Sequence, residues 1–140
     1  MTRAAAVAVA LVAALAAMAL GQKIWPNPAG APAPPSSLLP VFIGLEAFSA
    51  IVFGLGVSFL VFGYGAVARA RQPAWLTYGT YVSLAWLLVS WWPHGNLHRV
   101  TQTGNWTNLL AIDYGFHLTL MAAAGVVAVF FLRTLRESKS

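Results

Sequence analysis

The residues that could carry chemistry in this chain are few, because it contains three acidic residues, three histidines and no cysteine. Without cysteine, a disulfide frame, a zinc–thiolate site, an iron–sulfur cluster and a thiol nucleophile are excluded. Glu137 lies in a basic C-terminal tail and needs no special explanation. The other ionisable groups of this kind form a candidate polar pocket, which consists of Glu46, His94, His98, Asp113 and His117.

The spacing of these residues points to metal chemistry. Asp113 and His117 are four positions apart, so on a helix their side chains share one face. His94 and His98 have the same spacing, although the proline and glycine beside them disfavour a regular helix there. Imidazole nitrogens and carboxylate oxygens without sulfur suit zinc, iron or copper. The predicted metal ligands are His94, His98, Asp113 and His117.

Other readings of the same residues remain open. The set also suits a proton relay, or a polar pocket for a quinone or a lipid head group. A haem held by two histidines is less favoured. A purely structural role is the further alternative, in which Asp113 and His117 form an interhelical hydrogen bond that fixes packing. Glu46 would then pair with Arg99, with His94 or with a backbone group, and the loop histidines would be solvated.

Composition indicates that lipid is the solvent of this chain. Hydrophobic residues make up 59% and charged residues 8% of its 140 residues, whereas soluble domains carry about a quarter charged residues. The length suits a single domain. The basic residues are scattered singly at the ends of apolar runs and form no cluster, so no nucleic-acid partner is predicted.

Four apolar stretches approach the ~20 residues that cross a hydrocarbon core. The connection between the second and third stretches is short, so those two helices should be antiparallel neighbours. We predict an all-α, integral membrane four-helix bundle that spans residues 1–140 as one transmembrane domain. The predicted helices are 4–21, 38–68, 75–92 and 109–133, with extracytoplasmic loops over 22–37 and 93–108.

The first apolar stretch also resembles a secretory signal peptide. A basic start, an alanine-rich core and the small residues Ala17 and Ala19 around Met18 are the marks of such a segment and its cleavage site. We predict a retained helix, because small residues let neighbouring backbones approach closely in a membrane.

Basic residues orient the predicted helices. With both termini in the cytoplasm, six of the eight basic residues lie on that side, as the positive-inside rule requires. These six are Arg3, Arg69, Arg71, Arg133, Arg136 and Lys139. At 1.5 Å per residue, Glu46 and His117 lie roughly 12 Å and Asp113 about 6 Å below the outer boundary. The candidate pocket therefore belongs to the outer half of a bacterial inner (plasma) membrane that the chain crosses several times.

The pattern resembles the DoxX-like family of small four-helix bacterial membrane proteins. The resemblance is carried, in chain order, by Arg3, Gly21-Gln22-Lys23, Gly44-Leu45-Glu46, Pro93-His94-Gly95 and Asp113-Tyr114. It implies a membrane component associated with oxidoreductase or quinone-linked chemistry within a larger complex. The chain departs from the family pattern at Asp113, where the family tends to have glutamate, and in its long Pro-rich first loop.

Three functions follow from these observations. The first is an accessory or redox- and quinone-associated component of a membrane complex, assembled with other subunits or as a homo-oligomer in the lipid bilayer. The second is a metal-binding membrane protein or metalloenzyme that uses the histidines and acids. The third is a small proton-coupled transporter with Glu46 and Asp113 as carriers. It is the least favoured, because transporter sites lie near the membrane midplane.

Overall fold

The computed structural model describes residues 3–101 and 104–137, and these ranges contain helices and connections without a strand. The all-helical prediction is confirmed. Lys139, which was used to orient the chain, lies outside the described residues. The elements are α1 (Arg3–Ile24), α2 (Leu39–Phe62), α3 (Tyr64–Ala68), α4 (Ala74–Val89), α5 (Trp91–Val100), α6 (Trp106–Leu110), the π-helix η1 (Ala111–Leu118) and α7 (Thr119–Glu137).

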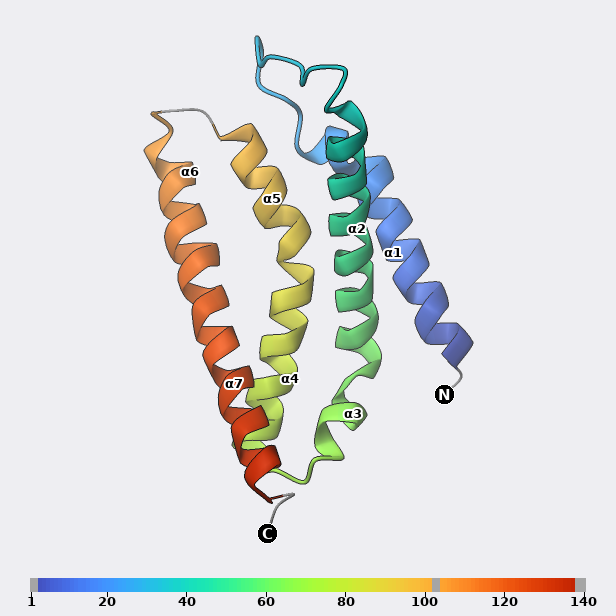
Figure 1. The fold of residues 1–140 in the computed structure, drawn as a ribbon, viewed down its shortest axis with the longest axis vertical. Coiled ribbons are helices and arrows are strands. Elements are labelled where there is room, and N and C mark those ends of the chain that lie inside the picture. The colour runs from blue at the N-terminus through green and yellow to red at the C-terminus, as the bar shows by residue number, and fades with distance from the viewer. Residues whose placement is uncertain (1–2, 102–103, 138–140) are drawn as a thin grey trace.

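The long helices stand side by side as an open row (Figure 1). Helix α1 packs on α2, α2 packs on α4 and α4 packs on α7. Helix α5 follows α4 upward in the view, and α6, η1 and α7 succeed one another without a break. Helices α1 and α7 therefore lie at opposite edges of the row, and the connection between α1 and α2 lies at the same end as α5 and α6.

Within the described residues, three helical segments are long and apolar enough to cross a membrane, namely α1, α2 and the continuous segment Trp106–Glu137. Helix α4 is apolar but has only 16 residues. Large apolar side chains lie exposed along all of them; Leu11 is 57%, Val82 59% and Met121 72% exposed. A water-soluble monomer rarely exposes so much contiguous apolar surface, whereas a lipid-facing one does.

Small residues bring α1 against α2. A Cβ atom added to Gly54 would collide with the backbone oxygen of Ala10 and would lie 3.0 Å from the Cβ of Ala14. One turn further along α2, the hydroxyl of Ser58 donates a hydrogen bond of 2.8 Å to the backbone oxygen of Ala6. Close backbone approach and a hydrogen bond between helices are the two means by which helices associate in lipid.

A second glycine of α2 faces the opposite neighbour. A Cβ at Gly56 would lie 2.7 Å from the Cβ of Leu88 on α4. The phenol of Tyr81 on α4 donates to the backbone oxygen of Leu60, which adds a polar contact to the same interface. Gly54 and Gly56 thus let α2 approach a helix on each of its two sides.

The predicted helix over 38–68 is divided in the structure. Helix α2 ends at Phe62, and α3 begins at Tyr64. The residue between them is Gly63, whose amide donates to the oxygen of Phe59 at 2.6 Å and whose Cα hydrogen faces the ring of the same residue. The ring occupies the space that a side chain at Gly63 would need, so this position accepts only glycine.

The predicted loop over 93–108 is wrong for its first part, because helix α5 runs through it as far as Val100. Pro93 is the third residue of this helix, where a backbone amide has no intrahelical partner and its absence costs nothing. The next residue, His94, donates its amide to Ser90 at 2.9 Å. The histidines that the sequence placed in a loop therefore stand on a helix.

Candidate metal centre

Three imidazole rings meet where α5 lies beside η1. The Nε2 atom of His94 is 3.1 Å from that of His117 and 3.0 Å from that of His98. The third edge of the triangle, between the Nε2 atoms of His98 and His117, measures 3.4 Å. Two of these rings come from adjacent turns of α5 and the third from η1, so the cluster exists only because the two segments pack together.

The size of this triangle matches a metal site. Zinc binds histidine nitrogen at about 2.0–2.1 Å with tetrahedral angles, which puts ligand nitrogens roughly 3.3 Å apart. The three observed edges of 3.0, 3.1 and 3.4 Å bracket that value. An ion at the usual bond length would lie about 0.9 Å from the plane of the three nitrogens. Three of four tetrahedral positions are then occupied by protein.

Hydrogen bonds alone satisfy this triangle poorly. In a neutral imidazole each ring nitrogen is either a donor or an acceptor, along one direction in the ring plane. When three Nε2 atoms face one another, two of them can form a donor–acceptor pair. The third nitrogen then faces another nitrogen of its own kind, either donor against donor or lone pair against lone pair. A cation at the centre would satisfy all three lone pairs at once.

Asp113 holds the orientation of one ring. Its Oδ1 atom lies 3.2 Å from Nδ1 of His117. When Nδ1–H donates to this carboxylate, Nε2 of the same ring carries the lone pair that faces the triangle. The sequence predicted Asp113 as a direct ligand; in the structure its carboxylate contacts the far nitrogen of His117, and the converging ligand atoms belong to the histidines.

The residues of η1 adopt a π-helix, in which backbone hydrogen bonds span five residues. Such segments are rare and recur at functional sites. Here the π-helix has eight residues and carries both Asp113 and His117. The sequence predicted an α-helix with these side chains on one face. The contact between them is present, although the backbone beneath it is wider.

Helix α4 supports this segment through one aromatic side chain. The indole of Trp86 stacks on Phe116 with ring centroids 5.9 Å apart and donates a hydrogen bond of 2.9 Å to the hydroxyl of Thr119. Phe116 in turn lies 5.2 Å from the ring of His94. Sequence reasoning took Trp86 for packing and did not single out Phe116 or Thr119, because nothing in their spacing distinguishes them from lipid-facing residues.

The environment favours the neutral form of His94. Burial lowers the pKa of this imidazole below its usual value of 6.5, and the nearby His98 and His117 lower it further. A neutral ring is the form that binds metal. His94 is half-buried, whereas His98 is exposed and the side chain of His117 is 45% exposed. The centre can therefore be reached from outside the helices.

Glu46 is not among the ligand atoms that converge in the histidine cluster, although it lines one groove together with His98. Its Oε1 atom lies close to Gly21 of α1, and the ring of Trp92 on α5 approaches the same glycine. Within the described residues it forms no ion pair. Its predicted partner Arg99 instead donates to Asn27 and to backbone and side-chain oxygens nearby.

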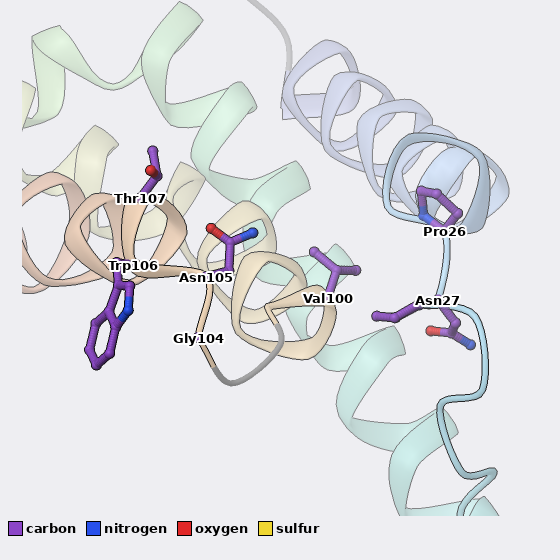
Figure 2. Close-up of a pocket in the computed structure, with 8 residues that line it drawn as sticks. Pro26, Asn27, Val100, Gly104, Asn105, Trp106 and Thr107 are labelled. Carbon is purple, nitrogen blue, oxygen red and sulfur yellow. The ribbon is translucent and has the colours of Figure 1, made fainter.

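A hollow of about 750 Å³ lies at the same end of the molecule, and none of the five predicted site residues lines it. Figure 2 shows Pro26 and Asn27 on the connection after α1, across from Val100 and Asn105.

No family model, curated protein or solved structure matches this chain. The resemblance to the DoxX-like family stays a prediction.

Proposed function

We propose that this chain is a membrane protein that binds a transition-metal ion through His94, His98 and His117. The observation that carries the proposal is the triangle of Nε2 atoms with edges of 3.0–3.4 Å. Asp113 supports it as the partner that sets the tautomer of one ligand. This choice favours the second function drawn from the sequence over the first.

Zinc is the ion that this ligand set suits best. Three nitrogen ligands without sulfur fit zinc and copper(II), and three histidines with one open position are a known zinc arrangement. The open position admits water or another small ligand. Zinc lowers the pKa of a bound water to about 7, so the arrangement suits either a hydrolytic reaction or reversible ligand binding.

The metal content of the purified full-length protein tests this proposal. The protein carries an affinity tag without histidine, is incubated with zinc and is dialysed before elemental analysis. We expect about one zinc ion per chain in the wild type and almost none in His98→Gln or His117→Gln, since removal of one of three ligands opens the site. Glu46→Gln serves as the control and should retain the ion. Wild-type protein without stoichiometric metal, or variants that retain it, contradicts the proposal.

We further propose that the chain crosses the bacterial inner membrane several times, with both termini in the cytoplasm and the metal centre toward the outside. The long apolar helices and the distribution of basic residues support this placement. The absence of cysteine gives a clean background for labelling. An impermeant maleimide should label Ser36→Cys in intact cells and Arg69→Cys only after permeabilisation; both positions are exposed. The reverse result would invert the orientation.

Membership of a larger redox or quinone-associated complex remains a second candidate. The open row favours it, because α1 and α7 each have one principal helical neighbour and present apolar side chains at the edges. Blue-native electrophoresis after mild solubilisation should then show partner subunits or a second copy co-migrating with the chain. A proton-coupled transporter is supported less, since Glu46 and Asp113 lie in different surroundings.

A further inference from the structure

A second site adjoins the histidine triangle, because His98 of α5 also lines it. A groove of about 1030 Å³ lies between α2, α5 and the connection after α1. Apolar side chains of α2 such as Leu39, Phe42 and Ile43 form one wall. Polar side chains also line it, including Glu46 and Arg99. Its volume is that of a site for a ligand of moderate size.

Glu46 is the acidic group of this groove. Gly21 makes room for it: a Cβ on that glycine would lie 3.3 Å from Oε1 of Glu46, and 3.9 Å from the ring of Trp92. The carboxyl is half-buried and has no ion-pair partner in the described part of the chain. A carboxylate in partly apolar surroundings is costly unless a cation accompanies it. A positively charged ligand would remove that cost.

The guanidinium of Arg99, which also lines the groove, forms hydrogen bonds with other residues. The guanidinium of Arg99 donates to the side chain of Asn27, to the backbone oxygen of Trp25 at 2.8 Å and to the side chain of Asn96 at 2.8 Å. These bonds tie the connection after α1 to α5. Arg99 therefore forms the frame of the groove and leaves Glu46 for a cation from outside.

Aromatic side chains add to the preference for a cation. Trp91 and Trp92 both line the groove. Indole rings attract ammonium groups through the electron density of their faces. The indole nitrogen of Trp92 is buried and has no hydrogen-bond partner among the described residues. A head group with an ammonium and neighbouring oxygen atoms would satisfy both groups. Its ammonium would contact the carboxylate of Glu46, and an oxygen would accept a hydrogen bond from the indole of Trp92.

We propose that this groove binds a membrane lipid whose head group carries a protonated primary amine. The ammonium contacts the carboxylate of Glu46, and an acyl chain lies along the apolar wall of α2. The site borders the metal centre at His98 but uses other residues and does not depend on a bound ion. A charge-assisted hydrogen bond of this kind corresponds to a preference of about tenfold over a lipid without the ammonium.

Native mass spectrometry of the full chain, released from detergent, tests this assignment. The probes are phosphatidylethanolamine, phosphatidylcholine and phosphatidylglycerol with identical acyl chains, each added at the same concentration. We expect the wild type to retain phosphatidylethanolamine about tenfold better than phosphatidylglycerol. Glu46→Gln should lose this preference. Asp113→Asn also removes one acidic group, but outside the groove, and should keep it.

Further measurements distinguish a lost lipid contact from a misfolded variant and from a general loss of lipid binding. Far-UV circular dichroism and the zinc content of Glu46→Gln establish that the variant is folded. Phe42→Ala, which shortens the apolar wall, should weaken retention of all three lipids without changing their order. Equal retention of phosphatidylcholine and phosphatidylethanolamine, or an unchanged preference in folded Glu46→Gln, would overturn the assignment while leaving the metal proposal intact.

Discussion

Replacement of Asp113 separates a metal ligand from a residue that positions one. The carboxylate contacts Nδ1 of His117 at 3.2 Å, so it acts on the metal through the imidazole ring. Asp113→Asn keeps an oxygen that accepts this hydrogen bond but removes the charge. Asp113→Ala removes both. Comparison of the two variants therefore divides the effect into an orienting part and an electrostatic part.

The size of the effect follows from the exposure of the pair. Loss of such a partner typically costs 10–100-fold in metal affinity. Here the side chains of His117 and Asp113 are 45% and 65% exposed, so water can replace part of the lost contact. We expect zinc affinity to fall about tenfold for Asp113→Ala, which corresponds to about 1.4 kcal/mol, and by a smaller factor for Asp113→Asn.

Competition against a chromophoric zinc chelator measures this change at fixed, slightly alkaline pH. Both variants should still bind about one ion per chain, because the three Nε2 ligands remain. Glu46→Gln is the matched control for the loss of an acidic residue and should bind zinc like the wild type. Complete loss of zinc in Asp113→Ala would make Asp113 a direct ligand. Unchanged affinity in that variant would show that its contact with His117 has no part in metal binding. Either result refutes the arrangement inferred here.

Further predictions concern the pH response, the packing and the frame of the groove. Because the pKa of His94 is lowered on folding, the unfolded chain binds more protons below its ordinary value of 6.5. The metal-free protein should therefore lose stability as the pH falls below 6.5 and through the lowered pKa, and thermal unfolding of His94→Gln should show a smaller loss. Zinc affinity in the wild type should also fall as the pH falls, because protons compete with the ion for the ligand nitrogens, and titration at several pH values checks this. Gly54→Val should destabilise the protein by about 1–3 kcal/mol, because the new side chain meets the backbone of α1, whereas Gly65→Val enters open space and should change little; thermal unfolding in one detergent compares them. Arg99→Gln should release the connection after α1, which limited proteolysis near Asn27 would detect as faster cleavage than in the wild type.

The sequence predicted the structure correctly where a residue pattern has only one physical explanation. Long apolar runs predicted the helices, because in lipid the backbone must satisfy its own hydrogen bonds. A spacing of four predicted the contact between Asp113 and His117, and a local contact of this kind needs no knowledge of tertiary packing. The same spacing in His94 and His98 was discounted because of Pro93, although a proline in the first turn of a helix is compatible with it.

Other features depended on packing that periodicity does not reveal. Glu46 was predicted at a depth that would let it reach the histidines, but depth does not specify which face of α2 it occupies. In the structure its carboxyl lies beside Gly21 and lines a groove that only His98 of the three histidines also lines. The π-helical backbone of η1 left no sign in the sequence, since no residue type selects it as glycine selects a turn. At the break between α2 and α3, the ring and the backbone oxygen of Phe59 crowd Gly63, a contact that composition alone does not show.

The π-helix also has a consequence for how such a centre can be gained or lost. A segment with five-residue hydrogen bonds holds more residues per turn than the α-helix on either side, so it resembles an α-helix that has absorbed an additional residue. Deletion of one residue between 111 and 118 would restore the α-helical register and rotate everything before it by about 100° relative to α7. Helix α7 could keep its packing on α4, while the residues before the deletion would turn relative to α7, and these include His117 when Leu118 is the residue deleted. Asp113 and His117 would still share one face, but that face would no longer be held toward the histidines of α5. A change of one codon would thus suffice to separate the membrane-spanning helix from its chemistry.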